Sequence, residues 1–486
     1  MKQRTTAFDL GAVALLALVS TAVYFAAGVR FDASPFPGYM QFIDSELLRD
    51  RLFESIWYSH AQPPGLNLLV GAAYRLGDAA PTFLSLLFHG LGLVAALGIF
   101  ALTLRLTGTR IAAYVCTGLI IMSPGFVLYE NWLMYTFLEV VLLVASAVAL
   151  YKMLDRGSTA WAVALFTILA MLVLTRGFFH LGWFVLVVGY VAWAAPNRLR
   201  VLGAAATPLA VATLWYAKNF IYFGTFAGST MFGLGFSNIG TLLATRAELA
   251  PLVEQGAVSP YALVSRYQDV FRLFEATTDP PTGIPVLDNQ WKSTGDLNFN
   301  YRPLAAISGH YAHDSFTVIR RYPASYVIGL LIANRLYFSP SSMNSYFSPE
   351  NRAAAEPFER IFNPLFYGVG AELRYVRQPH FGFDQPYVVE ANTSLSLMAW
   401  SALVVVLGWL RVRRAFVGGT VRDNTALITV GYLLFVMLYV YALGTLVELG
   451  ENNRYRFVAE PFLAVVTAVL ATDCVRRIKA RWWRSQ

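Results

Sequence analysis

Long apolar runs are the feature that most limits what this chain can fold into. About ten of them recur, each close to the roughly 20 residues that a helix needs to cross a bilayer. We expect spans near residues 8–28, 81–104, 110–128, 132–153, 158–175, 179–195, 200–219, 395–412, 424–446 and 455–473. Only 14% of the 486 residues are charged, whereas soluble domains carry roughly 25%. The sequence therefore predicts an α-helical polytopic membrane protein with about ten spans.

Basic residues predict which side of the membrane each link faces. They gather in the short links Arg105–Arg110 and Lys152–Arg156 and in the tail 476–484, and short basic links favour the cytoplasm. We therefore expect an integral protein of the cell (inner) membrane with both termini in the cytoplasm. This asymmetry accounts for the formal net charge of +8, so nucleic acid is not an expected partner, whereas membrane lipids are.

Changes in composition predict three regions. They are an N-terminal membrane module (1–220) with a functional first loop (29–80), an extracytoplasmic cap of mixed α/β or irregular structure (221–394), and C-terminal membrane helices with a basic cytoplasmic tail (395–486). Only 322–338 is apolar enough within the cap to be considered as a span. A crossing there would place the basic residues 411–414 outside, against the charge rule. We therefore expect a peripheral or partly embedded helix near 322–338.

The first loop carries an acid-rich stretch in front of Pro63 and Pro64. Asp44, Leu48, Arg51 and Ser55 recur at helical spacing, which predicts one short helix with these residues on a common face. The prolines end that helix, because the residue before a proline is disfavoured in the α region. The following segment, 65–76, is apolar but too short to cross, so we expect it to lie in the membrane interface.

Charged and polar residues at span ends are predicted to meet on the extracytoplasmic face. The candidate site residues are Asp44, Glu46, His60, Gln62, Glu130, Arg176, Lys218, Asn219, Arg454 and Arg456. Carboxylates beside several cations suit a substrate that is anionic near the membrane and hydroxylic above it, such as a lipid phosphate. Each cation taken alone is more simply explained as a headgroup anchor. The whole set is what favours a shared site.

Motifs of other chemistries are absent from the sequence. No P-loop, dinucleotide fingerprint, HExxH or GxSxG stands in a suitable context, and the two cysteines fall within one predicted span (Cys116) and at the end of another (Cys474). His310, His313 and Asp314 are close enough in sequence to suggest metal ligands, but polar surface side chains that bind no metal are the simpler interpretation. We therefore expect no metal site and no required cofactor. A divalent metal is possible but not indicated.

Four stretches, in order, resemble a GT-C glycosyltransferase of the protein-mannosyltransferase-like type, and together they cover most of the chain. They are FIDSE with HAQPPGLNLLVGAAYRLG, SPGFVLYENWLMYTFLE (123–139), LVLTRGFFHLGW with LWYAKNFIYFGTF (172–226), and ENNRYRFVAEPFLAVV (451–466). The chain also departs from the family. Ser45 separates two acids that are often adjacent, Lys218 replaces an arginine, Glu139 comes two places late, and there is no plain HPP.

The resemblance implies an inverting hexosyl or pentosyl transfer from a polyprenyl-phosphate sugar. The acceptor would be a hydroxyl of a cell-envelope glycan, lipid or protein at the extracytoplasmic face. By position, the resemblance implies Asp44 as general base, with Glu46 as its rival. It further implies that Arg176, Lys218, Arg454 and Arg456 bind phosphate, that His60 and Gln62 orient the substrates, and that Glu130 and Asn219 complete the substrate-binding set.

Two other functions stay open at this point. A lipid-linked glycan polymerase or ligase would share the donor chemistry. A lipid-linked saccharide flippase or transporter would place its charged residues near the middle of the membrane, whereas the predicted set lies at one face.

Overall fold

The computed structural model describes residues 5–264, 280–368, 370–377, 387–417 and 424–485. Seven helices in this part of the chain are long and apolar enough to cross a membrane, or eight if one bent pair is counted as a span. The seven are α1 (Ala7–Ala27), α6 (Ala80–Thr107), α9 (Tyr135–Arg156), α12 (Arg198–Phe223), α20 (Leu395–Val417), α21 (Thr425–Leu446) and α22 (Asn452–Ser485). The protein is therefore an integral membrane protein.

Each predicted span is helical, but one of them consists of two helices and the count of about ten spans is not confirmed. The segment predicted as one span at 110–128 is broken into α7 (Arg110–Ile121) and α8 (Pro124–Glu130), which meet at an angle of 61°. Pro124 starts α8, and the Ser123 hydroxyl accepts a hydrogen bond from the Phe126 N–H, so the chain begins a new helix there. The helices α10 (Thr159–Thr175) and α11 (Leu181–Ala194) are shorter than the others.

Side chains on the outer helices support the membrane assignment. On α1, Leu15, Leu18 and Phe25 are each more than half exposed. Such a row of apolar side chains would be an aggregation hazard in water, but it is favourable against lipid. Helix α10, by contrast, packs against both α9 and α12 inside the bundle.

The first loop differs from its prediction. The backbone leaves helical geometry at Arg51 (φ −133°, ψ 41°), so the expected single helix is divided into α3 (Ser45–Asp50) and α4 (Leu52–Tyr58). Asp44 is the N-cap of α3 and Arg51 is largely exposed, so the predicted common face does not form. The loop also contains α2 (Pro35–Gly38), η1 (Gly77–Ala79) and α5 (Gly65–Tyr74), an apolar helix of 10 residues.

The cap consists of helices and one hairpin within its described residues. Its helical elements are α13 (Phe232–Gly240), α14 (Arg246–Glu254), η2 (Pro260–Leu263), α16 (Pro285–Asp288), α17 (Pro303–Arg321), α18 (Pro323–Tyr337) and α19 (Pro349–Phe366). The strands β1 (Gly370–Arg377) and β2 (Tyr387–Ser394) pair antiparallel, with Gly370 opposite Ser394. The predicted helix near 322–338 is α18, which has 15 residues.

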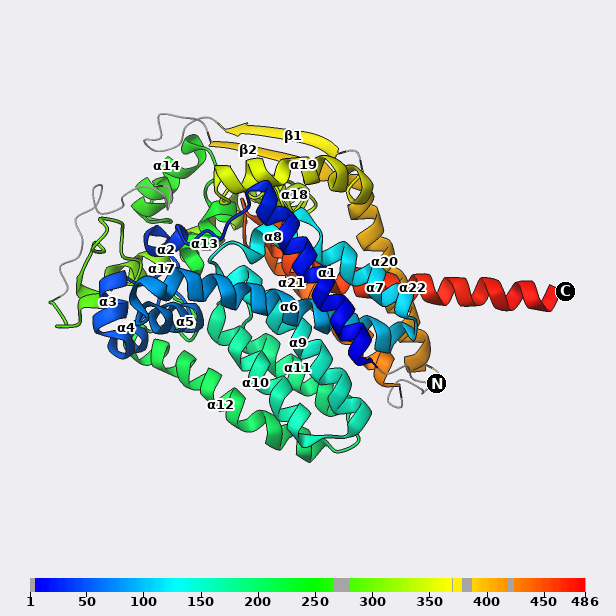
Figure 1. Cartoon of the computed structure of the whole chain (residues 1–486). Helices are drawn as coiled ribbons and strands as arrows, with labels where there is room; N and C mark the ends of the chain where they lie inside the picture. The colour runs from blue at the N-terminus through cyan, green and yellow to red at the C-terminus, as the bar shows by residue number, and fades with distance from the viewer. Residues whose placement is uncertain (1–4, 265–279, 369, 378–386, 418–423, 486) are drawn as a thin grey trace.

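The helices place the two chain ends opposite the first loop. In Figure 1 the N and C marks lie on one side of the molecule, and α3, α4 and α17 lie on the other. Two apolar cores join these parts. One combines α9 to α12 with α21 and α22, and the other combines the first loop with α6, α8 and the start of α9. Helix α9 belongs to both cores, and the cavity described next is beside its first residues.

Candidate functional site

A cavity of about 750 Å³ lies where the first loop, the cap and the membrane helices meet. Its walls include Tyr39 and Gln62 of the first loop, Tyr135 of α9, Arg176, Phe178 and His180 of the α10–α11 link, Phe232 and Phe236 of α13, Tyr439 of α21, and Glu448, Glu451, Arg454 and Tyr455. This size is within the range of small-molecule sites. Both aromatic and ionic side chains line it, and the two kinds of group are in contact, since Arg176 lies over the rings of Tyr135 and Tyr455.

Arg176 is a buried cation in this wall. It follows the last residue of α10, and its guanidinium lies over the rings of Tyr135 and Tyr455, at 4.6 and 4.3 Å from the ring centroids. Its Nη1 donates to Glu139 Oε2 at 3.0 Å. Burial disfavours the charge, but the Glu139 carboxylate outweighs it and holds the pKa of Arg176 well above its usual value. Arg176 therefore stays charged.

Arg454 is the second buried cation and comes from the first turn of α22. Its Nε donates to the Thr136 hydroxyl at 2.7 Å, and its Nη1 donates to Glu451. Its Nη2 is buried and has no hydrogen-bond partner among the residues that the structure describes. An unpaired buried donor is costly, and an anionic ligand would satisfy it. The start of a long helix adds positive potential at the same place.

Carboxylates also line the cavity. Glu448 accepts a hydrogen bond from Asn238 Nδ2 at 3.3 Å, and Glu451 pairs with Arg454. Neither acid is among the predicted site residues, because the prediction for 448–456 rests on its arginines. The available signal was the spacing of Glu451 and Arg454, which are three residues apart at the start of a helix.

His180 is a further lining residue that sequence analysis did not select. Its Nδ1 accepts a hydrogen bond from the Gly182 N–H at 3.2 Å, and burial lowers its pKa. The imidazole is therefore neutral near pH 7.

Asp44 and Glu46 do not line this cavity. Asp44 is 5% exposed, and its carboxylate accepts three hydrogen bonds. The donors are the Ser293 N–H at 2.7 Å, the Ser293 hydroxyl at 2.6 Å and the Glu46 N–H at 3.1 Å. Glu46 itself is exposed to solvent. Asp44 thus caps α3 and joins the first loop to the cap.

His60 is buried within the contact between first loop and cap. Its ring nitrogens contact Thr230 Oγ1 at 2.7 Å and the Asn300 carbonyl at 2.9 Å. Burial lowers its pKa to about 3, so the imidazole is neutral. Of the first-loop candidates, Gln62 is the one that lines the cavity.

Lys218 and Asn219 of α12 are turned toward neighbouring backbone. Lys218 Nζ donates to the Ser59 carbonyl at 2.6 Å and lies 3.6 Å from the Trp215 ring centroid. Asn219 Nδ2 donates to the Ala227 carbonyl at 2.7 Å. Lys218 therefore joins α12 to the first loop, and Asn219 joins α12 to Ala227, which lines the cavity.

Glu130 and Arg456 lie in separate places. Glu130, at the end of α8, is 3.7 Å from the His89 ring on α6. Arg456 donates to the carbonyls of Tyr337 and Ser339 at 2.7 and 2.8 Å.

Of the predicted residues, the structure brings Gln62, Arg176 and Arg454 together around one cavity. Within the described ranges, no group of three or more His, Cys, Asp or Glu is placed to hold a metal.

Comparisons with known proteins give distant similarities. No protein-family model matches the chain, and no curated protein matches it. The chain is similar to a crystal structure of ArnT from Cupriavidus metallidurans bound to undecaprenyl phosphate, with 14% sequence identity, 95% of this chain and 78% of that chain covered, and a TM-score of 0.33. The apo state of the same protein gives 13% identity, 94% and 77% coverage, and a TM-score of 0.32.

Proposed function

We propose that the protein is a GT-C-type inverting glycosyltransferase of the membrane, which moves a sugar from a polyprenyl-phosphate donor to an acceptor hydroxyl at the extracytoplasmic face. The observation that carries this proposal is the pair of buried guanidinium groups around Tyr135, one of which has an unpaired donor. Guanidinium groups are the donors that commonly recognise the oxygens of a phosphate monoester or diester.

The arginine pair would act on the leaving group. As the bond between the anomeric carbon and the phosphate oxygen breaks, negative charge grows on the lipid phosphate. Arg176 and Arg454 are held in place by Glu139 and Thr136 before substrate arrives, so they can stabilise that charge without reorganising. We propose that no metal is required, because these cations supply the positive charge.

Three aromatic residues of the cavity would receive the first isoprene units of the donor. Phe178, Trp183 and Tyr439 line it, the rings of Phe178 and Trp183 both contact Tyr439, and the Phe178 ring lies 5.3 Å from the Arg176 guanidinium carbon. Apolar and aromatic surface next to buried cations fits an amphiphile with an anionic head.

The acceptor hydroxyl must pass its proton to a carboxylate within hydrogen-bond reach. Glu448 and Glu451 line the cavity, so we propose that one of them is the general base. Asp44 remains the alternative that the family resemblance implies. It would need to be released from Ser293, which now occupies both of its oxygens.

The test uses the purified full-length protein in lipid nanodiscs with a panel of polyprenyl-phosphate sugars and cell-envelope acceptors. Mass spectrometry should detect a glycosylated acceptor and the free polyprenyl phosphate, with and without EDTA. The proposal predicts that the wild-type protein binds polyprenyl phosphate that has no attached sugar, and that the Arg176→Gln/Arg454→Gln double variant does not. No binding, or equal binding by the double variant, would refute it. Movement of an intact lipid-linked sugar across liposomes would favour a transporter instead.

A further inference from the structure

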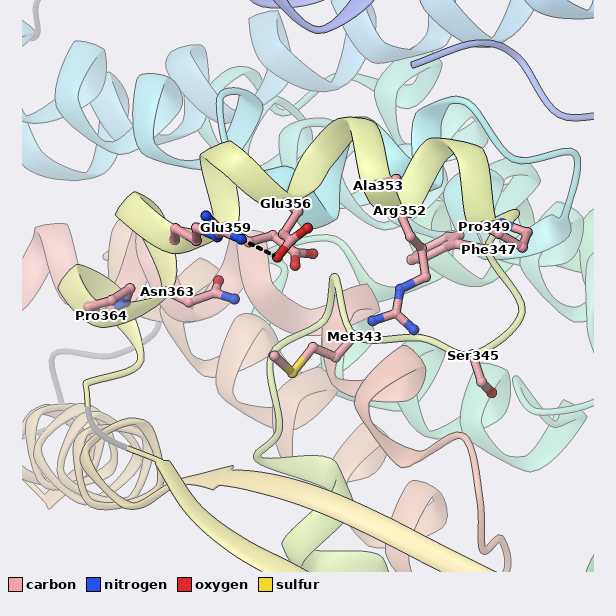
Figure 2. Close-up of a pocket in the computed structure, with 11 residues that line it drawn as sticks. Met343, Ser345, Phe347, Pro349, Arg352, Ala353, Glu356, Glu359, Asn363 and Pro364 are labelled. Atoms are coloured by element: carbon pink, nitrogen blue, oxygen red, sulfur yellow. Dashed lines mark hydrogen bonds and ion pairs between the residues drawn. The ribbon is translucent and has the colours of Figure 1, made fainter. Parts of the chain in front are cut away.

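A second cavity lies between α19 and the segment 343–347 that precedes it. It has a volume of about 690 Å³ and is separate from the cavity with the arginine pair. In Figure 2 the side chains of Arg352 and Asn363 extend from α19 toward Met343 and Ser345 on the opposite wall. We refer to this cavity as the α19 groove.

Two acceptor oxygens in the α19 groove have no partner in the protein. Glu359 is only 9% exposed, and its Oε1 is buried without a hydrogen bond among the described residues. Asn363, one helical turn later on the same face, has a buried Oδ1 in the same condition. Buried acceptors are nearly always paired with protein, water or ligand, so these two at neighbouring positions are available to a ligand that supplies donors.

The charges of the groove argue for a neutral ligand. Glu356 pairs with Arg360 at 2.8 Å. The other two charged lining residues, Arg352 and Glu359, have opposite charges, so the lining has no net charge. A metal ion would require an excess of negative ligands. A sugar hydroxyl both donates and accepts hydrogen bonds, which matches a lining that offers carboxylate, amide, hydroxyl and guanidinium groups together.

The wall between the α19 groove and the arginine cavity is a single layer of chain. Ser345 and Phe347 line the groove, whereas Tyr346 between them lines the arginine cavity and lies 5.9 Å, ring to ring, from Tyr39. The wall is also tied to the cation site. Asn453, the neighbour of Arg454, donates to the Met343 carbonyl at 3.2 Å. A ligand in the groove would therefore lie beside the place of transfer.

We propose that the α19 groove binds sugar residues of a carbohydrate acceptor through hydroxyls other than the reacting one. This inference rests on the proposed function and assigns its acceptor to the glycan class. Glu359 and Asn363 accept hydrogen bonds from the hydroxyls, and Arg352 donates to their oxygens.

The test measures, by saturation-transfer NMR, the binding of methyl glycosides to the full chain in nanodiscs. The glycosides are the glucoside, galactoside, mannoside and arabinoside. The variants are Glu359→Leu and Asn363→Leu. They remove acceptors without partners in the protein, so the fold should be retained. The matched control is Glu350→Leu, an exposed position in the first turn of the same helix that does not line the groove. At least one glycoside should bind the wild type and the control, and each groove variant should bind it about tenfold more weakly or worse.

Polyprenyl phosphate binding is measured in parallel on the same samples. The inference is overturned if no glycoside binds, or if the groove variants bind glycosides as well as the control. If glycosides bind through Glu359 but polyprenyl phosphate does not bind at all, the groove assignment stands and the proposed transferase function fails. If the groove variants lose only glycoside binding and keep polyprenyl phosphate binding, both hold.

Discussion

Arg176 and Arg454 share one aromatic partner, because their guanidinium carbons lie 4.6 and 4.9 Å from the ring centroid of Tyr135. The two cations come from the link between α10 and α11 and from the first turn of α22. Their mutual repulsion is offset by the carboxylates of Glu139 and Glu451. A phosphate between them would be contacted by charge-assisted donors in a site of low dielectric.

Replacing Arg454 should weaken donor binding. Arg454→Gln removes the charge and the unpaired Nη2 donor, so the affinity for polyprenyl phosphate should fall about tenfold or more. Fluorescence or native mass spectrometry in nanodiscs would measure this, with Arg413→Gln on the exposed part of α20 as control. Unchanged affinity in Arg454→Gln would remove this residue from the site.

Three isosteric variants show which carboxylate is the general base. If that base is one of the two cavity glutamates, its variant, Glu448→Gln or Glu451→Gln, should lower the rate of sugar transfer by about 10² to 10⁴-fold. Asp44→Asn should retain activity, since Asn is also a good N-cap and its carbonyl can still accept from Ser293. A steady-state transfer assay measures all three. If Asp44→Asn alone is inactive while it still binds donor, Asp44 is the base.

His60 should make stability depend on pH. Its pKa is about 3 in the fold and 6.5 without burial, so the native state binds fewer protons than the unfolded state between these values. Stability should therefore fall as the pH drops below about 6.5, by at most about 1.4 kcal/mol per pH unit. Thermal unfolding of wild type and His60→Gln at pH 7, 6 and 5 tests this. The difference between the two proteins should narrow as the pH falls, and a constant difference would contradict the prediction.

Glu130 should act in helix packing. A Cβ atom at Gly92 would clash with Glu130 Oε1, and the Glu130 side chain is buried and must shift to relieve the clash, so Gly92→Ala should destabilise the α6–α8 contact by about 1 kcal/mol. Gly90→Ala on the same helix meets open space and is the control. The double variant Gly92→Ala/Glu130→Ala should recover part of the loss. Equal melting temperatures for the two alanine variants would show that this contact does not constrain α6.

Hydropathy was enough to locate the membrane helices, because each apolar run must satisfy its backbone hydrogen bonds internally. It did not predict the bend at Ser123–Pro124, since an apolar run looks continuous whether or not its helix turns. The break at Arg51 was also missed, because the helical spacing of Leu48 and Ser55 is compatible with one helix or two. Local sequence contains no information that would choose between them.

The same reasoning found part of the candidate site. Arg176 and Arg454 could be predicted because they belong to a set of charged residues at span ends that all map to one membrane face, although each cation alone would be explained as a headgroup anchor. The position of Asp44 could not, because its partner Ser293 is 249 residues away and nothing near Asp44 in the sequence identifies that partner. Glu451 was overlooked because its role depends on a cavity that only the folded chain defines.

The contact between Asp44 and Ser293 also has a consequence for synthesis of the protein. Residue 293 leaves the ribosome 249 residues after residue 44, which at typical elongation rates is a delay of roughly 10 to 50 s. Throughout that interval the first loop has been made but lacks its partners Ser293 and Asn300. Arg454 follows later still. A truncated nascent chain therefore cannot form the cavity that Arg176 and Arg454 line, and this cavity is complete only when α22 has been inserted.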